Sequence, residues 1–200
     1  MNYYFRGEIM SYNPLAFGLI LVGTGALMFA NYLYAHFKEH INHSKEKTYG
    51  SVFLLIGILA GIFGFGLFFS TPIPGQYIEI YGVGYLLFSM LFIIAALCLL
   101  NSWDYRPASV FASIAGVILI SSACVVYHFQ MSKSPLGTAF IFLLSGLGSI
   151  STYKLAHLHG YKNQKGYLVI AITIFALVGL IMLYSGLSAQ FEHIAMALAA

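Results

Sequence analysis

Residues Gly50–Thr71 read GSVFLLIGILAGIFGFGLFFST, and none of them is Asp, Glu, Lys, Arg or His. A helix of this length rises about 33 Å at 1.5 Å per residue, which matches the roughly 30 Å hydrocarbon core of a bilayer. This segment therefore predicts a helix that crosses a membrane.

Five further segments have a similar length and also lack Asp, Glu, Lys, Arg and His. The six predicted spans are Pro14–Ala35, Gly50–Thr71, Ile80–Asn101, Pro107–Tyr127, Pro135–Tyr153 and Gly166–Leu187. The 200-residue chain is 60% hydrophobic and 8% charged, whereas soluble domains carry about 25% charged residues. We therefore expect an all-α integral membrane protein, with one domain over residues 1–200 that forms a bundle of six transmembrane helices in the lipid bilayer.

The connections between these spans differ in positive charge, which predicts an orientation. One side holds seven Lys and Arg residues, and the other holds only Arg6 and Lys133; the seven are Lys38, Lys45, Lys47, Arg106, Lys154, Lys162 and Lys165. Because cytoplasmic loops are enriched in Lys and Arg, we expect both termini on the outer face of the plasma membrane. The first span is too long for a cleaved signal peptide, so we expect it to be retained. The net charge of +3 follows from this topology, and no nucleic-acid partner is predicted.

Five of the seven histidines lie on the predicted cytoplasmic side, at His36, His40, His43, His157 and His159. If the first helix continues past the membrane, His36 and His40 are one turn apart, a spacing at which histidines chelate metal ions. His36 and His43 would then be about 10 Å apart along the axis, so a site would need help from the other two histidines. A metal ion is the one cofactor that this pattern suggests. The alternative is a solvated helix end, where cationic side chains suit the helix dipole.

A second candidate site precedes the third span, in the segment PIPGQYIE at residues 72–79. The prolines and the glycine predict a rigid turn that carries Gln76, Tyr77 and Glu79. Glu79 would bind a cation or accept a hydrogen bond from a ligand. The alternative is that Glu79 stabilises the N-terminus of the third helix.

Small and polar residues within the spans predict contacts between helices. Gly57 and Gly61, in the helix at 50–71, have the spacing that permits close contact with another helix. That helix would belong either to the same bundle or to a partner, which would be a second copy of the chain or another membrane protein. Interhelical hydrogen bonds are expected from five polar residues, Asn31, Ser89, Ser121, Ser122 and Thr173.

Three functions remain open from the residues alone. No catalytic motif is present and no charge lies at depth, which argues against a proton relay and leans against an enzyme. The first hypothesis is a non-catalytic accessory or structural subunit of a membrane complex. The second is a histidine-rich metal-binding redox or sensor component. The third is a carrier of a neutral or lipidic small molecule, which requires a cavity between the helices.

Three motifs carry a resemblance to a known family: TPIPGQYI at Thr71–Ile78, the helix start Tyr81-Gly82, and NSWDYRP at Asn101–Pro107. Over about Gly50–Tyr153 the chain resembles an uncharacterised membrane family of archaea and some bacteria, domain-of-unknown-function family 981. The resemblance implies a multi-span membrane protein without an assigned reaction, and it supplies no site residues. The N-terminal histidine segment lies outside this matched part.

Overall fold

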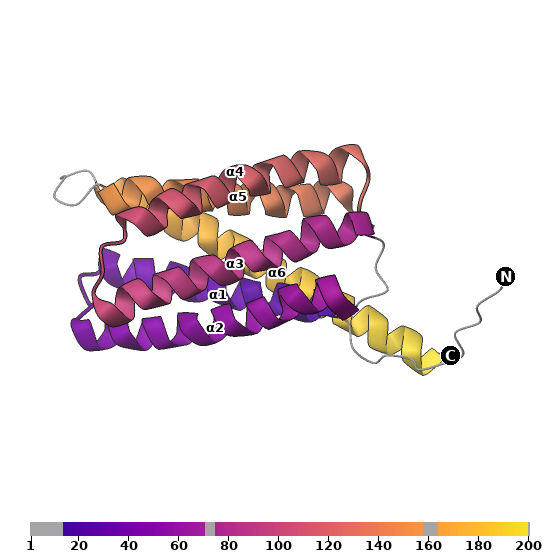
Figure 1. Cartoon of the computed structure of the whole chain (residues 1–200), viewed down its shortest axis with the longest axis horizontal. Coiled ribbons are helices and arrows are strands. Elements are labelled where there is room, and N and C mark those ends of the chain that lie inside the picture. Colours follow the sequence, from indigo (N-terminus) through magenta and orange to yellow (C-terminus); the bar gives the residue numbers. More distant parts are fainter. Residues whose placement is uncertain (1–13, 71–74, 158–163, 200) are drawn as a thin grey trace.

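The computed structural model describes residues 14–70, 75–157 and 164–199, and every regular element in these ranges is a helix (Figure 1). The helices are α1 (Pro14–Phe37), α2 (His43–Ser70), α3 (Gly75–Asn101), α4 (Arg106–His128), α5 (Pro135–His157) and α6 (Gln164–Ala199). Each is long and apolar enough to cross a membrane. The predicted all-α bundle of six membrane-spanning helices is therefore confirmed, and the chain has the character of a multi-pass membrane protein.

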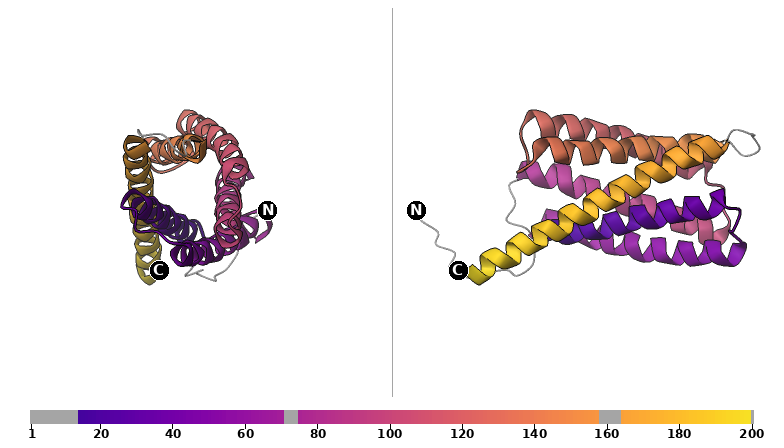
Figure 2. Two further views of the ribbon diagram at one scale, coloured as in Figure 1. Left: turned by 90° about the vertical axis from the view of Figure 1, so that its left-hand side faces the viewer. Right: turned by 180° about the vertical axis from the view of Figure 1, so that it is seen from behind.

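Several helices extend beyond the uncharged segments, because those segments mark the hydrocarbon core and not the helix ends. Helix α2 begins at His43 instead of Gly50, since the side chain of Asn42 accepts a hydrogen bond of 2.9 Å from the backbone N–H of Lys45 and caps the first turn. Helix α6 continues to Ala199, and its 36 residues span about 54 Å. Figure 2 shows α6 running diagonally across the bundle, with its C-terminal part beyond the other helices.

The one-turn spacing of His36, His40 and His43 depends on the condition that the first helix continues through His43, and this condition is not met. Helix α1 ends at Phe37, and Glu39 takes a left-handed backbone conformation with φ of 56°. Such a residue commonly ends a helix. His40 therefore lies in a turn, and His43 opens the next helix.

The bundle is built from three tight antiparallel pairs: α1 with α6, α2 with α3, and α4 with α5. Glycines allow the paired backbones to touch. A Cβ atom added at Gly116 would lie 2.6 Å from the carbonyl oxygen of Gly146, and one at Gly23 would lie 2.9 Å from that of Gly179. In the third pair, Gly57 of α2 faces α3, so this glycine serves a contact within the chain, which is one of the two roles its spacing predicts.

The three pairs close into a ring in chain order, which the end-on view in Figure 2 shows. Large apolar side chains such as Ile62, Val117 and Leu180 are exposed on the outer faces, as expected for contact with lipid. One end carries the α1–α2, α3–α4 and α5–α6 connections and is called the basic end. The other, called the distal end, carries the start of α1 and the end of α6. Which end faces the cytoplasm stays a prediction.

Two of the five polar residues make the interhelical hydrogen bonds that were expected. Asn31 Nδ2 donates to the hydroxyl of Tyr49 over 3.0 Å, and Ser89 Oγ donates to the carbonyl of Gly57 over 2.8 Å. For the other three the expectation is wrong: the hydroxyls of Ser121, Ser122 and Thr173 donate to carbonyls four residues earlier in their own helices. A helix always offers such a carbonyl, so the local bond needs no partner helix.

Candidate functional site

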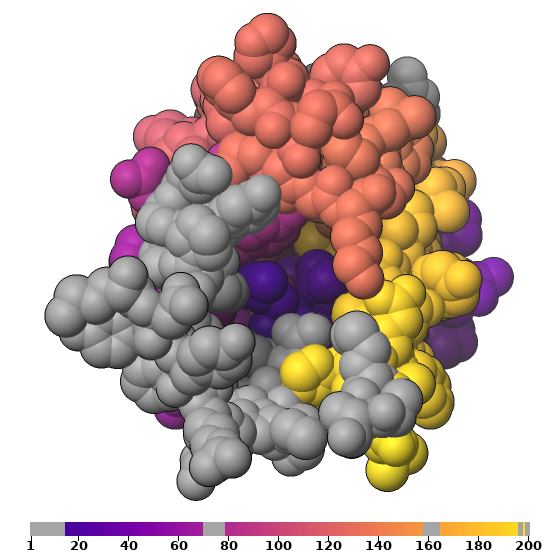
Figure 3. All heavy atoms as spheres, turned by 90° about the vertical axis from the view of Figure 1, so that its right-hand side faces the viewer, coloured from indigo at the N-terminus to yellow at the C-terminus, as the bar shows by residue number. Residues whose placement is uncertain are grey.

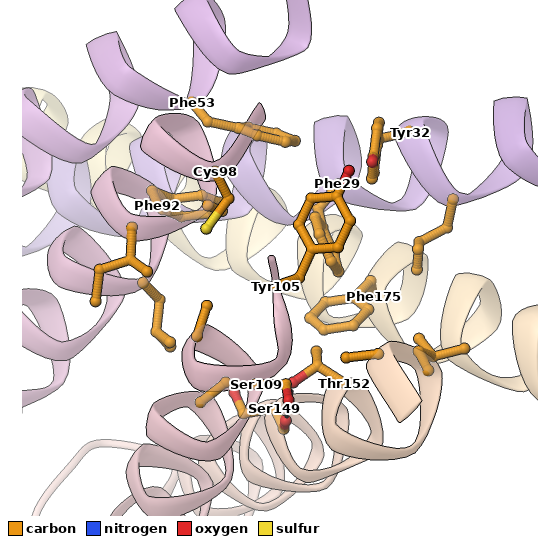
Figure 4. A pocket seen from close by; sticks show the side chains of 18 of the residues that line it. Phe29, Tyr32, Phe53, Phe92, Cys98, Tyr105, Ser109, Ser149, Thr152 and Phe175 are labelled. Atoms are coloured by element: carbon orange, nitrogen blue, oxygen red, sulfur yellow. Dashed lines mark hydrogen bonds between the residues drawn. The ribbon is translucent and has the colours of Figure 1, made fainter. Parts of the chain in front are cut away.

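A cavity of about 420 Å³ lies inside the ring toward the basic end. All six helices and the α3–α4 connection contribute to its wall. Seven of the lining side chains are aromatic, and we therefore call it the aromatic chamber: Phe29 and Tyr32 (α1), Phe53 (α2), Phe88 and Phe92 (α3), Tyr105 (α3–α4 connection) and Phe175 (α6). Figure 4 shows most of these side chains around the cavity.

The aromatic side chains contact one another in a continuous series along one wall. The ring of Phe29 meets Phe175 edge-on at a centroid distance of 4.7 Å and lies 6.0 Å from Phe53, which in turn lies 5.9 Å from Phe92. These distances are those of favourable aromatic pairs. The series links α6, α1, α2 and α3, so this wall is a packed and rigid surface.

The opposite wall consists of small side chains from the α4–α5 pair. Ala108, Ser109 and Ala112 line it from α4, and Ser149 and Thr152 line it from α5. Figure 4 shows Ser109, Ser149 and Thr152 across the cavity from Phe53 and Phe92. The cavity exists because small residues on this wall stand across from large rings.

One charged side chain reaches the aromatic chamber. Glu46, in the first turn of α2, is the only Asp, Glu, Lys or Arg among the described residues that line it. Its side chain is partly buried, with 23% exposed, and Oε2 lies 3.8 Å from Nδ1 of the exposed His43. Burial raises the pKa of the Tyr105 phenol above its ordinary value, and the negative charge of Glu46 raises it further. The Tyr105 hydroxyl therefore keeps its proton at neutral pH.

A second cavity of about 460 Å³ lies inside the ring toward the distal end and is called the distal chamber. Figure 3 shows the molecule from this end, hollowed between the α4–α5 side and α6, with α1 visible at depth. Tyr81 donates a hydrogen bond of 3.0 Å to the carbonyl of Met131, and Tyr85 one of 2.8 Å to that of Leu15. Lys133 is the only charged residue among the described lining, and its ammonium pairs with Glu192 at 3.0 Å.

Ser145 lies where the two chambers meet. It lines both of them together with Phe88, and it is 3% exposed. Its hydroxyl has no hydrogen-bond partner in the protein, although Ser113 of α4 shows the ordinary bond to the carbonyl four residues earlier. Buried hydroxyls are nearly always satisfied by protein, water or ligand. Ser145 therefore offers a polar group to whatever occupies the chambers.

The structure separates the histidines that the sequence grouped. His36, in the last turn of α1, lines the aromatic chamber and packs edge-on against Tyr32 at 4.7 Å. His40 lies exposed in the α1–α2 connection, beside the carbonyl of Lys38. His43 stands at the start of α2 next to Glu46.

The remaining two histidines of the predicted site lie at and beyond the end of α5. His157 ends α5, where its Nδ1 lies 2.9 Å from the carbonyl oxygen of Tyr153, and His159 lies outside the described residues. Within the described part of the chain, no three His, Cys, Asp or Glu side chains gather closely enough to hold a metal ion. The proposed metal site stays a prediction.

The predicted site before the third span is only partly described. The side chains of Gln76 and Tyr77 lie outside the described set, and Glu79 is exposed on α3 at the distal end. Glu79 lines neither chamber. The ligand role of these three residues stays a prediction.

Sequence reasoning missed the chambers, although a signal for them exists. Ser145, Ser149, Thr152 and Ala156 recur at intervals of three or four residues, so they form one small-residue face of α5. Such a face is equally typical of close helix contact. Here it lines a cavity, and the separate contact of Gly146 with Gly116 holds α5 against α4.

No curated protein and no solved structure matches this chain. Residues 10–196 match the family described as protein of unknown function DUF981. The match is longer than the expected Gly50–Tyr153, and it includes the histidine segment at the end of α1 and the whole lining of both chambers. The chain therefore belongs to the DUF981 family of proteins of unknown function.

Proposed function

We propose that this protein is a carrier in the plasma membrane that holds an elongated lipidic molecule inside its helical ring. The observation that carries the proposal is the pair of adjoining chambers, which share Phe88 and Ser145. Their volumes of about 420 and 460 Å³ lie in the range of small-molecule binding pockets, about 300–1,000 Å³. The carrier hypothesis requires a cavity, and a ring with two adjoining cavities supports it.

The chemistry of the lining supports a lipidic ligand. Ligand pockets are mostly apolar and contain a few placed polar groups. The chambers follow this pattern, because rings and small aliphatic side chains surround the buried hydroxyl of Ser145, which has no partner in the protein. A polar atom partway along the ligand would satisfy that hydroxyl. The middle of the bundle offers hydroxyls instead of charges, which favours a lipidic cargo over a small ion.

The other two hypotheses remain predictions. An accessory subunit would copurify with a stoichiometric partner from native membranes. A metal-binding component would contain a metal that is lost when His36 and His40 are replaced by alanine. The described surface offers lipid-facing apolar side chains that fit either a bilayer or a protein partner, so it does not favour the accessory role.

The test compares two phenylalanine substitutions on the same helix. Ala112 is buried and lines the aromatic chamber, whereas Val117 is exposed on the outer face. Each variant is purified from native membranes, and bound small molecules are measured by native mass spectrometry and solvent extraction. We expect the wild type and Val117→Phe to retain about one small molecule per chain, and Ala112→Phe to lose it because the new ring fills the chamber.

Two results would overturn the proposal. One is a wild-type protein that carries no molecule beyond the bulk lipid found with an unrelated membrane protein. The other is equal retention by Ala112→Phe and Val117→Phe. Thermal unfolding of each variant establishes that the comparison is between folded proteins.

A further inference from the structure

We infer that the aromatic chamber selects a lipophilic organic cation, whose positive group lies between the aromatic wall and Glu46. This inference rests on the proposed function and adds the charge of the ligand to it. Three observations carry it: the sign of the charge in the chamber, the aromatic wall beside that charge, and the different chemistry of the distal chamber.

The first observation is that a negative charge reaches the chamber without a close fixed cation. His43, at 3.8 Å from Glu46, is exposed and is charged only when protonated. Two lysine ammonium groups of the basic end are engaged elsewhere, Lys45 with the carbonyl of His40 and Lys154 with the hydroxyl of Tyr167. The other titratable side chains in the lining are His36, Tyr32, Cys98 and Tyr105. The structure pairs no Lys or Arg of the described chain with Glu46, so its carboxylate can pair with a bound cation.

The second observation is that the carboxylate stands beside an aromatic wall. Tyr105 points toward Tyr32 at the same part of the cavity (Figure 4), and Glu46 lines the same cavity, where its negative charge helps to raise the pKa of the Tyr105 phenol. Cations bind aromatic faces within about 6 Å, and the attraction grows when both partners are shielded from water. A carboxylate at the rim and rings behind it together favour a positive group with an apolar surface.

The size of the cation follows from the cost of removing it from water. A small ammonium loses a large hydration energy on entering an apolar cavity, whereas a charge spread over a large organic ion loses much less. The chamber has room for a drug-sized ion at about 420 Å³. A bulky, apolar cation therefore fits this chamber better than a metal ion or a small amine.

The third observation is the contrast with the distal chamber, whose only charged lining residue in the described chain is Lys133. The described lining of the distal chamber contains no Asp or Glu, and its Lys133 is paired with Glu192, so a positive group would be attracted to Glu46 in the aromatic chamber instead. The ligand would thus be oriented with its cationic end toward the basic end of the bundle, and the rest of its length would extend past Ser145 into the distal chamber.

The test uses two probe ions of the same shape and opposite charge, tetraphenylphosphonium and tetraphenylborate. Binding to the purified full chain is measured by equilibrium dialysis, with protein-free detergent as the correction for partitioning. We expect the phosphonium to bind about tenfold more tightly than the borate. Glu46→Gln should lower phosphonium affinity about tenfold and leave borate binding unchanged or stronger.

The control is Glu39→Gln, which removes an exposed carboxylate from the same end of the bundle and should change phosphonium affinity less than about twofold. A second variant, Phe92→Leu, removes one ring of the wall and should lower phosphonium affinity about threefold. If Glu46→Gln does not fold, Phe92→Leu and the comparison of the two probe ions still test whether the chamber selects cations.

The outcomes separate this inference from the proposed function. Equal affinity for both probe ions, or no effect of Glu46→Gln, overturns the selection for cations. If that occurs while Ala112→Phe still loses the copurified molecule, the carrier function stands and only the sign of the ligand's charge is wrong. If Ala112→Phe retains that molecule, the carrier function itself fails.

Discussion

The two chambers share Phe88 and Ser145 and have similar volumes, but they use their polar groups differently. In the distal chamber, the hydroxyls of Tyr81 and Tyr85 donate to backbone carbonyls of other segments, and Lys133 pairs with Glu192. In the aromatic chamber, Glu46 has only a loose contact with His43 at 3.8 Å. The polar groups of the distal chamber thus serve packing, while Glu46 stays available to a ligand.

This difference shows that the size of a cavity alone does not identify the site that recognises the ligand. Both cavities are of ligand size, yet a polar group that is already satisfied gains little by binding a ligand. The aromatic chamber is therefore the part that recognises the ligand, and the distal chamber is the part that accommodates its length. Each prediction below changes a residue on which this contrast depends.

The largest effect is expected at the contact between α4 and α5, from Gly116→Ala. The added Cβ would lie 2.6 Å from the backbone oxygen of Gly146, so the α4–α5 pair must separate. Overpacking of this kind costs about 1–3 kcal/mol of unfolding free energy. Unfolding by SDS titration in mixed micelles measures it.

The matched control is Gly166→Ala in the first turn of α6, where nothing lies within 4 Å of the added atom. Alanine is the better helix former, so this change should raise the unfolding free energy by up to about 1 kcal/mol. Equal effects of the two substitutions would show that α4 and α5 are not in backbone contact.

Replacing the two buried serines, Ser145 and Ser89, should change the unfolding free energy by a smaller amount, and in different directions. Ser145→Ala removes a hydroxyl without a partner, so stability should stay the same or rise by up to about 1 kcal/mol. Ser89→Ala removes the 2.8 Å bond to Gly57 and should lower stability by about 1 kcal/mol. The same SDS titration compares them.

Retention of the copurified molecule supplies the second measurement for this pair. Ser145→Ala should weaken retention several-fold, and Ser89→Ala should leave it unchanged, since Ser89 lines neither chamber. A loss of stability from Ser145→Ala equal to that from Ser89→Ala would mean that the Ser145 hydroxyl has a partner within the protein.

The membrane-spanning helices could be predicted from the sequence because their cause is local. A segment such as Gly50–Thr71 contains no charge and has the length of the bilayer core, and no tertiary information is needed to recognise it. Helix ends depend on capping instead, and the effect of Asn42 on the start of α2 is visible only in the geometry. The helical spacing assumed for His36, His40 and His43 was inaccurate for the same reason, because α1 ends before Glu39.

The chambers could not be predicted, because they depend on how the helices pair. Phe29, Phe53 and Phe92 are ordinary apolar residues in their own helices. They form a wall only after α1, α2 and α3 are placed side by side opposite the small face of α5. The position of Glu46 could not be predicted either. Its place before the span at 50–71 predicts a solvent-exposed side chain, whereas in the ring of helices it lines the cavity.

The smallest effect is expected at the ion pair between Lys133 and Glu192, which joins the α4–α5 connection to α6 at the distal end. Both side chains are mostly exposed, and such pairs contribute below about 1 kcal/mol because water and salt screen them. A double-mutant cycle with Lys133→Ala and Glu192→Ala, measured at low and high salt, should give a coupling that falls as salt rises. Phosphonium affinity should stay within about twofold, because the pair is screened from the aromatic chamber. A coupling well above 1 kcal/mol, or a large loss of phosphonium binding, would mean that the distal chamber takes part in recognition, and the contrast between the chambers would then be wrong.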